Sequence, residues 1–130
     1  MRYSLKIVLF ACSSLVLVSN ALAKTPSCSK DIQGIYSNTH DRYPQAVVIS
    51  NDGHVMGSYQ DRNDIQHVWQ GNAILNGESV TITYSHLVPS KNSDGKLTLT
   101  RSPDNCSFYG KGKSIDGKWA PDNLIFYKER

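Results

Sequence analysis

The chain has 130 residues, of which 39% are hydrophobic, and its 14 lysines and arginines against 11 acidic residues give a formal net charge of +3. This length fits one small domain and excludes two globular ones. A charge this small also gives no sign of a strongly basic nucleic-acid-binding protein.

Residues 1–23 have the pattern of a secretory signal peptide. A basic start is followed by a mostly apolar run over 7–18 and by small residues, Ala21 and Ala23, at the two positions that a signal peptidase reads. The apolar run is too short for a membrane-spanning helix, which needs about 20 residues. We therefore expect a secreted or periplasmic protein without a membrane anchor. Its single mature domain, 24–130, would carry 12 basic and 11 acidic side chains, a net charge of about +1.

Removal of the signal peptide leaves two cysteines, Cys28 and Cys106. An oxidising compartment favours a bond between them, and no C-x-x-C spacing suggests a redox role. We predict a structural disulfide that joins the two ends of the domain.

The mature chain has few strong helix formers, and its β-branched and aromatic residues alternate with polar ones, which predicts strands. Turn sequences such as Asn76-Gly77 and Asp116-Gly117 separate the alternating runs. The expected strands are eight: 33–38, 45–50, 54–60, 67–75, 79–85, 96–101, 107–114 and 123–129.

Eight short antiparallel strands joined by hairpins commonly close into an up-and-down barrel, because closure removes exposed strand edges. Glycines inside the strand patterns, at Gly57, Gly71, Gly110 and Gly112, permit the sharp bending of a barrel. A small all-β barrel is therefore the predicted fold, and a two-sheet sandwich is the alternative.

Residues 34–38 (G-I-Y-S-N) and 52–59 (D-G-H-V-M-G-S-Y) resemble the opening of avidin-type biotin-binding barrels, G-x-W-x-N followed by D-G-x-L-x-G-x-Y. Residues 68–71 and 80–84 are loosely similar to the fourth and fifth strands of that family. The chain has two tryptophans, Trp69 and Trp119, where the family has several that face the ligand. Parts of the pattern also occur in lipocalin-like barrels, so the resemblance bears mainly on the fold.

The resemblance implies a small ligand in the mouth of the barrel. Asn38 and Tyr59 match the positions that donate hydrogen bonds to the ureido oxygen of biotin, and Tyr84 stands where a ligand-packing tryptophan is usual. Aromatic walls exclude water from such a site, and Tyr36 and Trp69 are further candidates for them.

The densest polar cluster is His40, Asp41, Arg42 and Tyr43, which falls in the first hairpin connection and is a candidate surface for a partner protein. A small hydrolase is an alternative, with His40, His67 or His86 as the base and Asp41 as its orienting carboxylate. The histidines lack the short spacing that prepares zinc ligation, so we expect neither metal nor cofactor.

In Tyr109-Gly110-Lys111-Gly112-Lys113 the tyrosine and both lysines alternate onto one strand face. This face is either solvated or meets phosphates, an acidic polysaccharide or an acidic protein. Given the small net charge of the mature chain, we do not expect nucleic-acid binding.

The leading prediction is a non-enzymatic secreted or periplasmic binding protein that holds a small ligand in the barrel mouth or a partner protein through its loops. The alternatives are an inhibitor or immunity-type protein that acts on an enzyme or toxin, and the small hydrolase.

Overall fold

The computed structural model describes residues 27–38, 44–88 and 94–130. The predicted signal peptide, 1–23, lies outside these residues, and so do His40, Asp41, Arg42 and Tyr43. The signal peptide and the partner-contact role of this cluster therefore remain predictions.

The described residues form eight strands, and all eight predicted strands are confirmed with ends that differ by at most three residues. They contain no helix long and apolar enough to cross a membrane. The strands are β1 (Gly34–Asn38), β2 (Gln45–Ile49), β3 (His54–Gln60), β4 (Gln66–Asn76), β5 (Ser79–Val88), β6 (Gly95–Arg101), β7 (Ser107–Ser114) and β8 (Leu124–Lys128).

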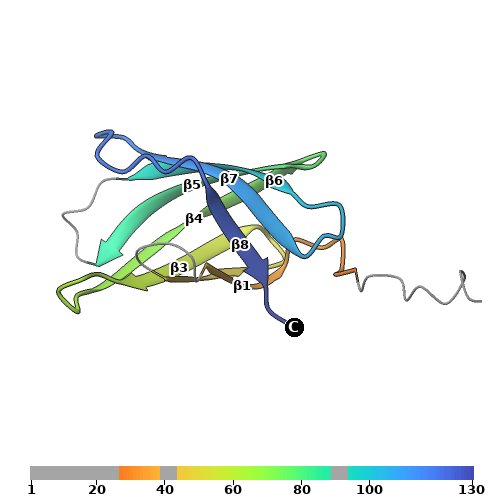
Figure 1. Cartoon of the computed structure of the whole chain (residues 1–130), viewed down its shortest axis with the longest axis horizontal. Coiled ribbons are helices and arrows are strands. Elements are labelled where there is room, and N and C mark those ends of the chain that lie inside the picture. Colours follow the sequence, from red (N-terminus) through yellow and green to blue (C-terminus); the bar gives the residue numbers. More distant parts are fainter. Residues whose placement is uncertain (1–26, 39–43, 89–93) are drawn as a thin grey trace, which may run out of the picture.

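The strands close into an antiparallel barrel in chain order, so the predicted barrel is confirmed and the sandwich alternative is wrong. Each strand pairs with the next, and β8 returns to β1 through the register pairs Tyr36–Lys128 and Ser37–Tyr127. In Figure 1, β6 and β7 lie on the upper side of the barrel, β1 and β3 on the lower side, and β8 crosses the front. Closure leaves no long unpaired edge.

The up-and-down order gives the barrel two different ends. We name the end where β1, β3, β5 and β7 finish the mouth, and the opposite end, which carries the N-terminal residues 27–33 and the end of β8, the closed end. The β3–β4 connection, at the left of Figure 1, therefore lies at the mouth.

Inward side chains fill the half of the barrel next to the closed end. The Tyr36 ring packs on Phe108 with centroids 5.1 Å apart, and the Tyr36 hydroxyl donates a 2.8 Å hydrogen bond to the carbonyl of Ile32. The cavity that remains among these apolar side chains has a volume of about 10 Å³. This half is therefore a packed core, not a ligand chamber. The buried apolar residues are Tyr36, Val47, Ile49, Val55, Trp69, Val80, Ile82, Tyr84, Leu97, Leu99, Phe108, Leu124 and Phe126.

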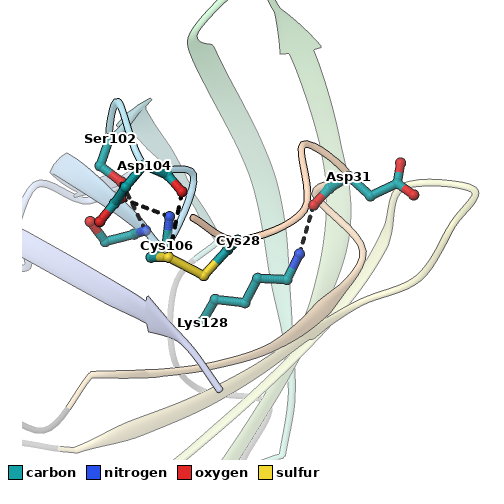
Figure 2. Close-up of a disulfide and its surroundings, with 7 residues drawn as sticks. Cys28, Asp31, Ser102, Asp104, Cys106 and Lys128 are labelled. Atoms are coloured by element: carbon teal, nitrogen blue, oxygen red, sulfur yellow. Dashed lines mark hydrogen bonds between the residues drawn. A yellow bond between two sulfur atoms is a disulfide. The ribbon is translucent and has the colours of Figure 1, made fainter. Parts of the chain in front are cut away.

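The predicted disulfide, Cys28–Cys106, is confirmed and lies at the closed end. Figure 2 shows it linking the N-terminal segment to the β6–β7 connection, where the Cys28 amide also donates to the carbonyl of Asp104. The Lys128 ammonium donates to the carbonyl of Asp31 from the end of β8. The N-terminal segment is thus fastened across this end, with Ile32 packed against the core.

Candidate functional site

A row of polar side chains lines the inside of the mouth. Asn38, Gln45, Tyr59 and His67 stand at inward positions of β1 to β4, and the register pairs each with the next across the strands. Asn38, Gln45 and His67 are buried, and Tyr59 is partly buried. The interior therefore changes from apolar at the closed end to polar at the mouth.

The alternation of inward and outward side chains along each strand explains this row. Asn38 shares a face with Tyr36, Gln45 with Val47, and His67 with Trp69, because side chains two apart on a strand point the same way. Each polar residue is the inward position nearest the mouth on its strand.

Aromatic rings pack beside the polar row. The Tyr59 and His67 rings are stacked, with centroids 4.5 Å apart and planes 3° apart. The His86 ring meets the rings of Tyr59, His67 and Tyr84 edge to face at 5.6 to 6.4 Å. Such contacts fix ring orientation, so the site is ordered before any ligand arrives.

Two larger rings continue this set of contacts into the barrel. The Tyr84 ring lies 5.4 Å from Trp69 and 6.2 Å from Trp119, measured between centroids. Trp69 is buried, while Trp119 comes from the β7–β8 connection and is partly buried. The mouth thus combines amide, imidazole and phenol groups with broad aromatic surfaces.

Three glycines make room for these rings. A Cβ added at Gly57 would lie 2.0 Å from Trp69, one at Gly95 would lie 2.3 Å from the Tyr84 hydroxyl, and one at Gly112 would lie 2.4 Å from Trp119. Each ring therefore lies against strand backbone where any other residue would collide with it.

A β-bulge adjusts the wall of the mouth between β4 and β5. The register pairs Trp69 with His86 but Val68 with Val88, so Leu87 is an extra residue on β5. Bulges bend a strand and redirect its side chains. Here the bulge directly follows His86, which pairs with Trp69. The side chains of His86 and Trp69 both face the mouth.

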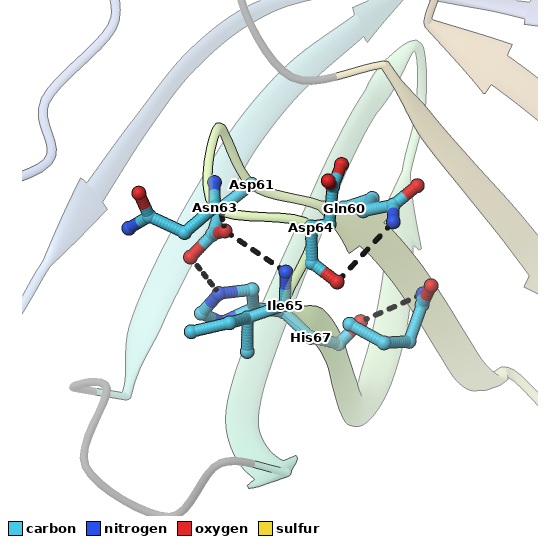
Figure 3. Close-up of polar contacts among 7 residues, drawn as sticks. Gln60, Asp61, Asn63, Asp64, Ile65 and His67 are labelled. Atoms are coloured by element: carbon cyan, nitrogen blue, oxygen red, sulfur yellow. Dashed lines mark hydrogen bonds and ion pairs between the residues drawn. The ribbon is translucent and has the colours of Figure 1, made fainter.

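Asp61 connects the β3–β4 connection to the polar row (Figure 3). Its Oδ2 lies 2.9 Å from Nε2 of His67, and its Oδ1 accepts hydrogen bonds from the amides of Asn63 and Ile65. The hydrogen bond from His67, followed by those from the two amides, holds the pKa of the Asp61 carboxyl below its usual range. An ionised Asp61 therefore orients the imidazole of His67.

Burial raises the pKa of Tyr84 to about 12, helped by the nearby Tyr59, Asp116 and Asp94. Tyr84 is thus a neutral phenol at any physiological pH, able to donate or accept a hydrogen bond. Burial likewise raises the pKa of Tyr36 to about 12.

The structure brings together four of the five predicted ligand-binding residues. Asn38, Tyr59, Trp69 and Tyr84 line the mouth or its inner wall, whereas the hydroxyl of Tyr36 points toward Ile32 at the closed end.

Two residues of the site, Gln45 and Asp61, were not predicted from the sequence. Gln45 had a detectable signal, since it is polar at the inward phase of a strand whose other inward residues, Val47 and Ile49, are apolar. The sequence holds no signal for the contact of Asp61 with His67, because this contact depends on how the β3–β4 connection folds back. Within 27–38, 44–88 and 94–130, no three His, Cys, Asp or Glu side chains gather as they would to hold a metal ion.

Fold and site together define the class of protein as a closed eight-stranded antiparallel barrel with a polar, aromatic-walled mouth. A scan of protein-family models, a search of curated proteins and a search of solved structures each found no match for this chain.

Proposed function

We propose that the protein is a secreted or periplasmic binding protein that holds a small ligand in the mouth of its barrel. The observation that carries this proposal is the polar row Asn38–Gln45–Tyr59–His67, buried or partly buried inside one end of a barrel whose interior is mostly apolar. Burial of polar groups costs free energy, and ligand sites are where a few such groups converge between aromatic walls.

The side chains favour a flat ligand with several hydrogen-bonding atoms, such as a small heterocycle. The amides of Asn38 and Gln45 each offer donors and an acceptor, and the rings of Trp69 and Tyr84 offer apolar surfaces for a planar group. The resemblance to avidin-type barrels adds Asn38 and Tyr59 as donors to a ureido oxygen, so biotin belongs among the ligands to test.

Four residues of the site already have interaction partners. Asn38, Tyr59, His67 and His86 each have an interaction partner in the structure. A ligand must therefore exchange or add to existing contacts, which favours polar ligands over purely apolar ones.

A melting experiment with a panel of flat heterocyclic metabolites, biotin included, tests the proposal. A ligand present at 100 times its Kd stabilises the folded state by about 2.7 kcal/mol, which is a clear rise in Tm. Titration of the hit, followed by tryptophan fluorescence, is expected to report binding beside Trp69.

Substitutions in the mouth test whether the ligand that raises Tm binds there. Tyr59→Phe keeps the ring and removes the hydroxyl, and Asn38→Ala removes the amide; each is expected to weaken binding at least tenfold. Asn72→Ala, on the outer face of β4, is the control and leaves affinity unchanged. The proposal fails if no member of the panel raises Tm, or if the hit binds both mouth variants as well as the wild type.

The contact between His67 and Asp61 also favours a second candidate, hydrolysis with His67 as the base. Assays on ester, glycan and nucleic-acid substrates would compare the wild type with His67→Gln and Asp61→Asn. Turnover that both variants lose supports an enzyme, and equal background in all three proteins excludes this candidate.

A further inference from the structure

A second feature lies on the outside of the barrel, away from the mouth lining. Lys96 on β6 and Lys113 on β7 are direct register partners, and Thr83 of β5 continues their row. In the adjacent row Thr98 of β6 pairs with Lys111 of β7. The three lysines are exposed and gather on one outward patch of sheet.

This patch forms the floor of a groove with a volume of about 570 Å³. Ile115, Ala120 and Pro121 of the β7–β8 connection form the apolar part of the wall. The wall is held in place, because the amide of Gly112 donates to the carbonyl of Pro121 at 2.9 Å. We call this feature the lysine groove.

The three lysines of the groove outnumber the acidic Asp122 that lines it with them, and they form no ion pair within the part of the chain that the structure describes. Among the described residues, no carboxylate lies within 4.0 Å of the three ammonium groups, whereas Arg101 near the closed end pairs with Glu78. Like charges directly opposite each other on neighbouring strands destabilise a sheet. The arrangement of Lys96 beside Lys113 therefore works against folding and suits a negatively charged partner.

We propose that the lysine groove binds an acidic peptide segment of a partner protein. Its carboxylates would meet Lys96, Lys111 and Lys113, and an apolar side chain between them would lie against Ile115 and Pro121.

Charge and surface chemistry favour this occupant over a highly charged polymer. A polyanion is bound by many basic side chains at once, but here three lysines share the groove with the acidic Asp122, and the mature chain has a net charge of about +1. An apolar wall also offers nothing to a sugar-phosphate backbone. It does match an apolar side chain placed between glutamates or aspartates.

The test uses a fluorescein-labelled peptide, Gly-Glu-Leu-Glu-Pro-Glu-Gly, and a matched peptide with glutamine in place of each glutamate. Fluorescence anisotropy is measured in low and in physiological salt. The glutamate peptide is expected to bind at least tenfold more tightly than the glutamine peptide, and raised salt should weaken it.

The variant Lys96→Gln/Lys113→Gln is expected to lose at least tenfold in affinity for the glutamate peptide while its Tm stays equal to or above that of the wild type. Ile115→Ser, which removes part of the apolar wall, should also weaken binding. Lys118→Gln is the matched control, since Lys118 is exposed on the same β7–β8 connection but does not line the groove.

Three results would overturn the proposal. They are equal affinity for the two peptides, unchanged affinity in the double variant, and tighter binding of dextran sulfate or a single-stranded oligonucleotide than of the glutamate peptide. The last result would assign the groove to a polyanion instead.

Discussion

At the scale of single residues, the glycines of the barrel wall decide where the aromatic rings of the mouth can lie. Gly57 is the clearest case, because the Trp69 ring occupies the space that a Cβ would need. A methyl group there must push the indole out of place or bend β3.

We expect Gly57→Ala to lower the free energy of unfolding by about 1–3 kcal/mol, the usual cost of overpacking a core. The change should also shift the fluorescence of Trp69. Urea unfolding and emission spectra measure both effects. Gly77→Asn serves as control, since a Cβ at Gly77 meets nothing within 4 Å and asparagine tolerates the positive φ of 61° there. Equal stability of the two variants would contradict this account.

Residue-level features of the site were only partly predictable from the sequence. Asn38 and Tyr59 were found through a local resemblance, and strand phase alone places both on the inner face. The contacts among His67, Asp61 and His86 were not predictable, because each depends on a turn conformation or a bulge that alternation does not encode.

At the scale of elements, the same short motif forms three of the turns between strands. Ser50 and Asp52, Ser102 and Asp104, and Ser114 and Asp116 each place a serine two residues before an aspartate, and the serine hydroxyl donates to the carboxylate. The carboxylate then accepts an amide two residues further on, as Asp104 does from Cys106. This Asx-turn geometry satisfies the turn's backbone.

Folding should therefore weaken in acid. The pKa of Asp52 is lowered chiefly by Ser50, that of Asp104 chiefly by Ser102, and that of Asp61 chiefly by His67. A carboxyl whose pKa is lower in the folded state than in the unfolded chain stabilises the fold above the unfolded value, near pH 4. That stabilisation is lost as pH falls through the lowered folded value.

We expect Tm to be nearly constant between pH 5 and 7 as far as these carboxyls are concerned, and to fall below about pH 4. The triple variant Asp52→Asn/Asp61→Asn/Asp104→Asn should melt lower at pH 7 and lose less on acidification. Scanning calorimetry from pH 2 to 7 checks this, with Asp122→Asn, an exposed groove carboxylate, as control. An acid loss as large in the triple variant as in the wild type would refute the assignment.

Strand positions were predictable because alternation and turn residues mark them independently. β3 and β7 match the expected ranges at both ends, and the largest difference is at the end of β5. That strand was expected to finish at Ser85 but runs to Val88, since the bulge at Leu87 interrupts the alternation on which the prediction depended.

At the scale of the whole molecule, the closed end and the mouth are built from different kinds of side chain. The closed end carries the disulfide, the fastened N-terminal segment and the apolar core, while the mouth carries the polar row. We therefore expect that stability and the proposed ligand binding can be changed separately.

Removal of the disulfide tests this separation. Cys28 and Cys106 are 78 residues apart, and in the loop-entropy model closing a loop of that length stabilises the fold by roughly 4 kcal/mol. Cys28→Ser/Cys106→Ser should unfold at a clearly lower urea concentration. Below that transition, its affinity for a mouth ligand should match that of the wild type. Reduced wild-type protein provides the matching control. An unchanged urea midpoint, or a loss of affinity in the folded variant, would contradict this separation.

Both ends of the described chain are held at the closed end. A protein coupled to a surface through either chain end would therefore have a defined orientation. The C-terminal residues leave beside β1, where the amide of Glu129 donates to the carbonyl of Ile35, and Cys28 is held at the same end. A tag or surface linker attached after Arg130 would point the mouth outward. A protein layer coupled in this way would present every barrel mouth to the solution.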